Sequence, residues 1–145
     1  MKNNKIVGFV ASTFDLFHAG HILMLKEAKT QCDYLIVGLQ SDPTVDRDWK
    51  NKPVQTLFER FVQVSACKYV DEIVPYTTES ELLDILQSYD IDVRIVGEEY
   101  LGKQFTGCEL DMKVYYNKRR HSFSSSELRC RVHDIESKRL EKISK

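Results

Sequence analysis

The sequence predicts a single α/β domain built on a parallel five-stranded sheet with helices on both faces. The length of 145 residues suits one domain. A hydrophobic content of 42% is enough to fill a three-layer core. Short apolar runs also alternate with helical patterns of about ten residues, as expected for strands joined by crossover helices.

The first strand and the first helix frame the most informative part of the chain. Apolar side chains predict a strand over residues 6–10. Apolar positions in residues 22–28 recur at helical spacing, so the helix should begin near Ala19. The free N–H groups and positive dipole end of such a helix attract an anion. His18 and His21 flank this start and share one helix face, which predicts a phosphate site.

The rest of the chain continues the alternation. Four more strands are predicted by apolar runs at residues 34–39, 73–74, 93–96 and 114–116. Three more helices open with capping boxes: Thr56 with Glu59, Thr78 with Glu81, and Ser124 with Glu127. Residues 41–55 are polar, contain two prolines and have no period, so we expect a mobile loop. Residues 133–145 should form an amphipathic helix that packs on the domain or frays.

Right-handed crossovers between parallel strands place the loops that follow the strands at one edge of the sheet, where ligands bind. These loops carry the side chains suited to phosphate chemistry: His18, His21, Lys50, Lys52, Glu98, Glu99, Arg119 and serines 124–126. The chain contains neither a dinucleotide-binding GxGxxG motif nor a P-loop. Phosphate binding must therefore use these other donors.

Composition indicates which kinds of partner the protein can bind and in which compartment we expect it. The 21 basic and 22 acidic residues give a formal charge of -1, which argues against a general nucleic-acid or membrane-surface binder. No apolar run approaches a membrane span, and residues 1–5 lead into a strand rather than a signal sequence, so we expect a cytoplasmic protein. The four cysteines form no CxxC or zinc-type cluster, which predicts reduced thiols.

The junction resembles a known signature. Thr13-Phe14-Asp15 followed by His18-Ala19-Gly20-His21 is similar to the HxGH motif of the nucleotidyltransferase superfamily, and within it to cytidylyltransferases of the glycerol-3-phosphate type. The resemblance runs from residue 5 to residue 132 through Glu59-Arg60, Tyr69-Val70-Asp71-Glu72, Gly97-Glu98-Glu99-Tyr100 and Phe123-Ser124-Ser125-Ser126. It implies a Rossmann-like domain over residues 1–132 with a charged helical tail over residues 133–145.

The resemblance also implies a reaction. A phosphate oxygen of a small phosphorylated alcohol or sugar attacks the α-phosphate of CTP, pyrophosphate leaves, and a CDP-activated product forms. Because the attacking phosphate is already ionised, positioning and charge stabilisation suffice for catalysis. Mg²⁺ is expected to arrive with the triphosphate, and Asp15 is a candidate contact to the metal-bound phosphate. Similarity to relatives that pair near Tyr69-Val70-Asp71 implies a homodimer.

Matching positions imply roles for individual residues. Catalytic roles are implied for His18, His21, Lys52 and Arg119. Nucleotide binding is implied for Ser12, Thr13, Phe14, Asp15, Gly20, Gly97, Glu98, Ser124, Ser125 and Ser126. Acceptor binding is implied for Lys50, Lys68 and Glu99. Arg119 should grip the β- or γ-phosphate, with Arg120 as the neighbouring alternative.

Other interpretations stay open. The family has glycine at the positions of Ser12 and Ser122, and commonly arginine at that of Lys68. An adenylyltransferase of the same fold, acting on a sugar phosphate or pantetheine phosphate, carries the same HxGH and serine-helix pattern. A noncatalytic module would bind the nucleotide without releasing pyrophosphate. The loop lysines can also be merely solvated, and the serines can act only as helix caps.

Overall fold

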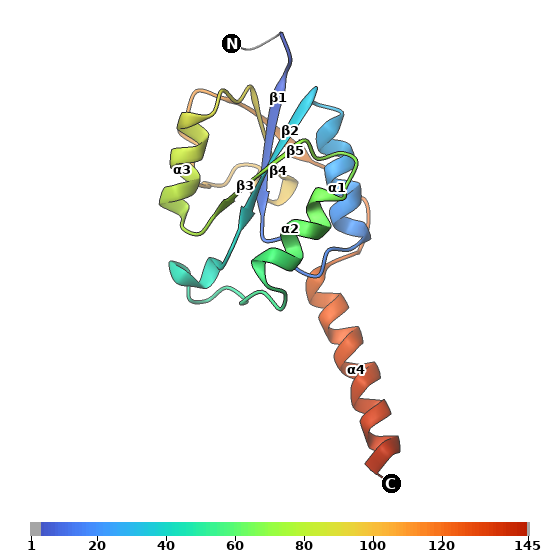
Figure 1. Cartoon of the computed structure of the whole chain (residues 1–145). Coiled ribbons are helices and arrows are strands. Elements are labelled where there is room, and N and C mark those ends of the chain that lie inside the picture. The colour runs from blue at the N-terminus through green and yellow to red at the C-terminus, as the bar shows by residue number, and fades with distance from the viewer. Residues whose placement is uncertain (1–3, 145) are drawn as a thin grey trace.

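The computed structural model describes residues 4–144, which form a five-stranded, wholly parallel sheet with helices on both faces (Figure 1). The strands are β1 (Val7–Ser12), β2 (Tyr34–Gln40), β3 (Glu72–Tyr76), β4 (Val93–Gly97) and β5 (Lys113–Asn117). Their order in the sheet is β3-β2-β1-β4-β5. β1 is therefore central, and the winding reverses between β1 and β4, which is the position where open parallel sheets bind ligands. The predicted fold class is confirmed.

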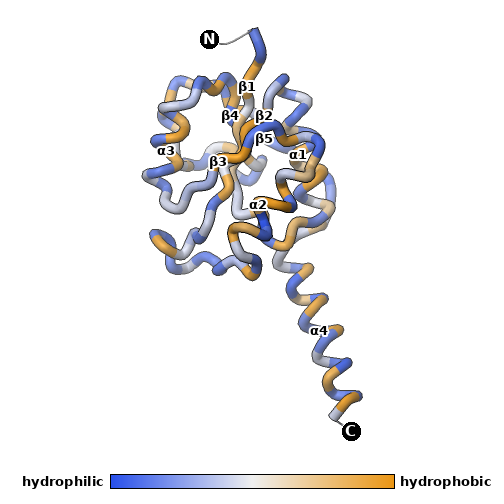
Figure 2. The backbone as a smooth tube through the Cα atoms, viewed as in Figure 1, coloured by the Kyte–Doolittle hydropathy of each residue, from blue (hydrophilic) through white to orange (hydrophobic). Residues whose placement is uncertain are grey.

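Four α-helices complete the layers: α1 (Ala19–Lys29), α2 (Leu57–Ser65), α3 (Glu79–Ser88) and α4 (Ser125–Ser144). Short 3₁₀ turns, η1 (Pro43–Val45) and η2 (Glu98–Tyr100), follow β2 and β4. α1 and α2 cover one face of the sheet, where Leu25 and Val64 pack against Val10. α3 covers the other face, where Leu82 packs near Phe9. The apolar segments gather along the strands between these layers (Figure 2).

The capping boxes expected from the sequence begin helices where predicted. The hydroxyl of Thr56 accepts from the N–H of Glu59, whose carboxylate accepts from the N–H of Thr56. The hydroxyl of Ser124 likewise accepts from the N–H of Glu127. At α3 the box is shifted, because the Glu81 carboxylate accepts from the N–H before the cap residue rather than from the cap residue itself.

No described side chain of the last helix is fully buried. α4 continues through the expected domain boundary at residues 132 and 133 without a break, and it projects from the rest of the fold (Figure 1). None of its described residues is buried, and apolar Val132, Ile135 and Leu140 are exposed. Among the described residues, no helix has both the length and the apolar content to cross a membrane.

A buried arginine ties the two central strands to α2. Arg60 is 2% exposed, and its Nη atoms donate to the carbonyls of Thr13, Gln40 and Ser41 at 3.0, 2.6 and 2.7 Å. Its Nε donates to carbonyls just before α2 at 3.2 and 3.3 Å. Burial lowers the pKa of this guanidinium, but the charges of Asp15 and Asp42 oppose that effect. The carboxyl ends of β1 and β2 are therefore held to α2 by a single side chain.

Replacing Arg60 with methionine removes all these donors while keeping an apolar side chain. Each carbonyl left buried without a donor costs about 1–3 kcal/mol, so the free energy of unfolding should fall by roughly 3 kcal/mol or more. Urea unfolding followed by circular dichroism measures this change. Arg131→Met, on the exposed surface of α4, is the matched control and should change stability by less than about 0.5 kcal/mol. Equal losses in the two variants would contradict the role of Arg60.

Candidate functional site

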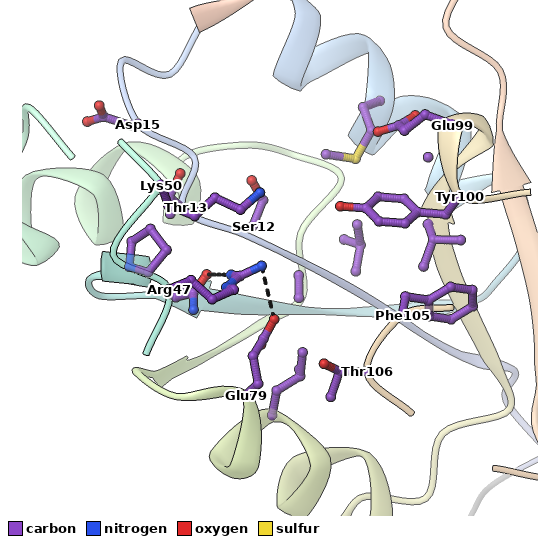
Figure 3. A pocket seen from close by; sticks show the side chains of 18 of the residues that line it. Ser12, Thr13, Asp15, Arg47, Lys50, Glu79, Glu99, Tyr100, Phe105 and Thr106 are labelled. Carbon is purple, nitrogen blue, oxygen red and sulfur yellow. Dashed lines mark hydrogen bonds and ion pairs between the residues drawn. The ribbon is translucent and has the colours of Figure 1, made fainter. Parts of the chain in front are cut away.

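A cavity of about 720 Å³ opens at the carboxyl ends of the strands. It is lined by the ends of β1 and β4 and by the loop after β2, and the first turns of α3 and α4 also contribute to its walls. Figure 3 shows Ser12, Thr13 and Lys50 on one side and Tyr100 and Phe105 on the other. The cavity thus lies where β1 and β4 diverge, as the strand order predicts.

The two histidines of the motif hold defined tautomers. The Nδ1 atom of His18 accepts the N–H of Gly20 at 3.0 Å, and Nδ1 of His21 accepts the N–H of His18 at 3.2 Å. A backbone N–H can only donate, so both Nδ1 atoms are unprotonated and both rings carry hydrogen on Nε2. The histidines therefore cap α1 through Nδ1 and present an N–H donor on the opposite side.

The donor of His18 begins a short hydrogen-bond chain. Its Nε2 lies 3.1 Å from Oγ of Ser125, the first residue of α4, and that hydroxyl donates to the backbone carbonyl of Asp15 at 3.2 Å. The Nε2–H of His21 has no protein acceptor among residues 4–144. One motif donor is thus paired with α4, and the other is left for a ligand.

Burial favours the neutral form of both rings, and stacking holds the rings in place. The His18 and His21 ring centroids are 3.9 Å apart, and Phe17 stacks on His21 at 5.6 Å. The pKa of His21 is lowered to about 3, mainly by burial and also by the neighbouring His18, against a raising effect of Asp15. Burial likewise lowers the pKa of His18, as do the charges of His121 and Arg119.

Gly20 is required by the packing of the histidines. A Cβ at this position would lie 2.8 Å from Cε1 of His18 and 3.0 Å from Cε1 of His121. The close approach that excludes a side chain here is therefore made by imidazole rings. His121 thereby joins the motif as a third histidine, and it stacks on Phe123 at 5.1 Å.

Asp15 anchors the loop after β2. It is 5% exposed, and its two carboxylate oxygens accept the N–H groups of Val54 and Gln55 at 2.8 and 2.9 Å. The Gln55 side chain in turn accepts the N–H of Leu16 at 2.9 Å. The expectation that Asp15 contacts a metal-bound phosphate is not favoured by this geometry, because both oxygens already serve the backbone. No group of three or more His, Cys, Asp or Glu side chains in residues 4–144 is placed to hold a metal ion.

Phe14 packs against the ring of His21 and does not line the cavity. It is fully buried, and its ring centroid lies 5.3 Å from that of His21. The side chain has no exposed surface and serves packing, and the implied nucleotide contact of Phe14 stays a prediction. Both Phe14 and Leu16 have positive φ, at 49° and 51°, which is uncommon for residues other than glycine. The loop between β1 and α1 therefore holds a strained conformation.

The cavity gathers about half of the residues implicated by the sequence: Ser12, Thr13, Asp15, Lys50, Gly97, Glu99, Ser125 and Ser126. Ser124 caps α4 from outside it, and Glu98 accepts the N–H of Arg119 at 3.3 Å. Lys52 is exposed beside Asp42, whose pKa it helps to lower, and it does not line the cavity. Lys68 is exposed 5.3 Å from the Tyr69 ring and also lies outside the lining.

The two adjacent arginines before α4 have different surroundings. The side chain of Arg119 donates to the carbonyl of Phe123 at 2.6 Å, and its charge acts on the pKa of His18. The charge of Arg120 acts on Tyr115, whose hydroxyl donates to Glu27 on the α1 face of the sheet. Arg119 is therefore the one of the pair that belongs to the histidine site.

Sequence reasoning missed two arginines that line the cavity. Arg47 pairs with Glu79 at 3.2 Å (Figure 3) and donates to Gln40, while Arg94 of β4 packs on Phe105. The signal was present for Arg94, a charged residue inside the apolar strand 93–97. No comparable signal marks Arg47, because it lies in the aperiodic loop.

Comparison with known proteins now decides the family. Residues 9–144 match the family model described as cytidylyltransferase-like. The chain belongs to this family. A probable ethanolamine-phosphate cytidylyltransferase of Encephalitozoon cuniculi is 44% identical to this cytidylyltransferase-like chain over 94 residues, which cover 63% of the chain and 28% of the relative. The bifunctional protein HldE of Campylobacter jejuni is 32% identical over 134 residues, which cover 92% of the chain and 29% of the relative.

Solved structures confirm the fold of the cytidylyltransferase-like chain. The lipopolysaccharide core biosynthesis protein of Thermoplasma volcanium superposes with a TM-score of 0.64 at 24% identity, covering 82% of this chain and 99% of that one. Pantoate-beta-alanine ligase of Francisella tularensis superposes with a TM-score of 0.61 at 17% identity, covering 84% of this chain and 62% of that one. The chain spans less than a third of the length of the two curated relatives above.

The pKa of His21 predicts how stability depends on pH. The unfolded chain takes up this proton near pH 6.5, whereas the folded chain takes it up only near pH 3. Between these values the unfolded state binds more protons, so the free energy of unfolding should fall as pH drops from 6.5 towards 3. In ¹⁵N NMR spectra the His21 ring should stay neutral, with hydrogen on Nε2, from pH 8 down to pH 5. Titration near pH 6.5 would contradict the tautomers assigned above.

Proposed function

We propose that this domain is a cytidylyltransferase that joins CTP to a small phosphorylated alcohol or sugar. The observation that carries the proposal is the pair of histidines at the N-terminus of α1, where Nε2 of His18 contacts Ser125, a residue that lines the cavity at the start of α4. Relatives named ethanolamine-phosphate cytidylyltransferase support CTP as the nucleotide. A cytosolic setting is part of the proposal, supported by four cysteines that are all free.

The reaction follows from fixed donors. An ionised phosphate oxygen of the acceptor attacks the α-phosphorus of CTP, a new P–O bond forms, and the bond to the bridging oxygen of the β-phosphate breaks. Pyrophosphate leaves with that electron pair, and no proton needs to be removed from the nucleophile. His21 donates to an α-phosphate oxygen through Nε2–H, and His18 exchanges Ser125 for phosphate. Their N–H groups stabilise the charge that develops at phosphorus.

The β- and γ-phosphates extend towards the start of α4. Ser125 and Ser126 line the cavity there, at the positive dipole end of α4, and the charge of Arg119 acts on His18. Lys50 faces the same cavity from the loop after β2, whereas Lys52 would need a movement of that loop to reach it. Mg²⁺ entering with the triphosphate would neutralise phosphate charge and be held by phosphate oxygens, since the chain offers no cluster of metal ligands within residues 4–144.

The test is pyrophosphate release with each of the four nucleoside triphosphates against a panel of phosphorylated alcohols and sugars. CTP should be preferred over ATP, and His18→Ala and His21→Ala should each lower turnover at least about a hundredfold, because one lost donor costs about 2.7–4 kcal/mol. Circular dichroism checks that both variants fold. Equal or faster release with ATP would indicate the adenylyltransferase alternative, and nucleotide binding without release would indicate a noncatalytic module.

Replacing Arg119 and Arg120 one at a time tests which of these two arginines before α4 binds the nucleotide. Arg119→Ala should weaken CTP binding and turnover strongly while the Michaelis constant for the acceptor changes little. Arg120→Ala, whose charge acts on Tyr115 rather than on His18, should have a mild effect and is the matched control. Steady-state kinetics with each substrate varied in turn give both constants. If Arg119→Ala raises only the acceptor's Michaelis constant, the assignment of Arg119 to the leaving group is wrong.

We further propose that the domain forms a homodimer through α2 and the segment that follows it. Phe58 and Val62 of α2 are 75% and 49% exposed, close in sequence to Tyr69-Val70-Asp71. Burying such side chains favours association. Sedimentation equilibrium at micromolar concentration should show a species of twice 16.9 kDa, and Phe58→Asp should shift it to the monomer. A wild-type protein that sediments only as a monomer would refute the dimer.

A further inference from the structure

The cavity extends to a second set of polar groups on the α3 face of the sheet. Arg94 lies opposite Phe9 in the register of β4 and β1, so both side chains project to the side that α3 covers. It is 7% exposed, yet it lines the cavity together with Phe105 and Thr106 from the segment after η2. A charged side chain is thus built into the far end of the pocket.

The guanidinium of Arg94 has few partners. Nη1 donates to the carbonyl of Thr106, and the guanidinium carbon lies 5.0 Å from the centroid of the Phe105 ring. Within residues 4–144 no carboxylate forms an ion pair with it. Glu79, the carboxylate on the same side of the cavity, is paired with Arg47 at 3.2 Å. A guanidinium has five N–H donors, so most of the donors of Arg94 are left for another partner.

The charges around Arg94 indicate which kind of ligand it can bind. Arg47 and Glu79 neutralise each other, and burial raises the pKa of the adjacent Tyr76, which keeps that hydroxyl uncharged. Glu109 lies near Arg94 but is exposed to solvent. At this end of the pocket the guanidinium of Arg94 therefore has no ion pair within residues 4–144, and a buried charge without a partner is costly. A monoanion fits it, whereas a dianionic phosphate would place excess negative charge beside Glu79.

The same geometry excludes a cationic group. Ammonium ligands bind on aromatic faces, and the face of Phe105 is already occupied by the guanidinium of Arg94. An ammonium placed here would also meet that positive charge at close range. The far end of the pocket therefore favours a negatively charged group, whereas an ethanolamine head group is positively charged.

We propose that Arg94 selects an acceptor that carries a carboxylate at the end remote from its phosphate, making the substrate a small phosphorylated carboxylic acid. This rests on the proposed function, in which the acceptor phosphate attacks the α-phosphate held at the histidines, and it places the remainder of the acceptor in the cavity towards α3. A carboxylate matches the planar fork of a guanidinium and accepts two parallel N–H bonds from it. Arg94 is thus a specificity-determining residue.

A matched pair of acceptors tests the proposal in the wild-type protein. Glycerol 3-phosphate and 3-phosphoglycerate share a three-carbon skeleton and differ by a hydroxymethyl group against a carboxylate. With CTP, kcat/KM should be at least tenfold higher for 3-phosphoglycerate, and ethanolamine phosphate should be the poorest of the three. Equal or higher kcat/KM for glycerol 3-phosphate or ethanolamine phosphate would overturn the proposal.

A variant then assigns the preference to Arg94. In Arg94→Met the ratio of kcat/KM for 3-phosphoglycerate over glycerol 3-phosphate should fall to about one, because the methionine keeps the apolar stem and lacks the charge. Arg131→Met, on exposed α4, is the matched control and should keep the wild-type ratio. A wild-type ratio in Arg94→Met would overturn the assignment. If Arg94→Met does not fold, the comparison of acceptors in the wild-type protein still decides the preference.

Binding measurements separate this proposal from the proposed function. Isothermal titration of the wild-type protein with 3-phosphoglycerate and with glycerol 3-phosphate requires no turnover. Tighter binding of 3-phosphoglycerate supports the carboxylate subsite even if no nucleoside triphosphate yields pyrophosphate, an outcome that would refute only the transferase activity. Pyrophosphate release with no preference for the carboxylate would refute the subsite and leave the transferase activity standing.

Discussion

The site depends on the buried guanidinium of Arg60. Parallel strands leave unpaired carbonyls where they end, and burying such groups without donors is costly. Arg60 supplies those donors to Thr13, Gln40 and Ser41 at once. Because the same side chain also bonds the carbonyls before α2, the ends of β1 and β2 and the start of the helix form one rigid unit. The cavity floor therefore keeps its shape without a ligand.

Asp15 extends this rigidity to the loop after β2. Its carboxylate fixes the end of the loop after β2, and its carbonyl receives the hydroxyl of Ser125 from α4. His18 bonds the same hydroxyl. Segments far apart in the chain thus meet within one hydrogen-bonded network, so the phosphate donors of α1 and α4 are positioned relative to each other before the nucleotide arrives. Preorganised donors need little rearrangement as charge develops.

Local patterns predicted the frame well because strand periodicity, capping boxes and crossover handedness are local or generic rules. The five strands and the starts of α2 and α4 follow from them. The pattern could not show that Phe14 is buried, because a motif residue in a tight loop can face either way. Lys52 and Lys68 were assigned by position, but the reach of a lysine depends on the loop that carries it. Arg94 was missed because the sequence does not show that Phe105 and Thr106 contact its guanidinium.

The electrostatics of the cavity separate its two ends. At the histidines, burial favours the neutral form of both imidazoles, so they donate hydrogen bonds without attracting phosphate by net charge. The positive charge is supplied by Arg119 and Lys50 near the triphosphate and by Arg94 at the far end. Under the proposed function, fixed neutral donors stabilise the charge that develops at phosphorus, whereas a cation at that atom would also stabilise the ground state. The arginines would then set which anions bind at each end of the site, and Arg119 would also support turnover through the leaving group.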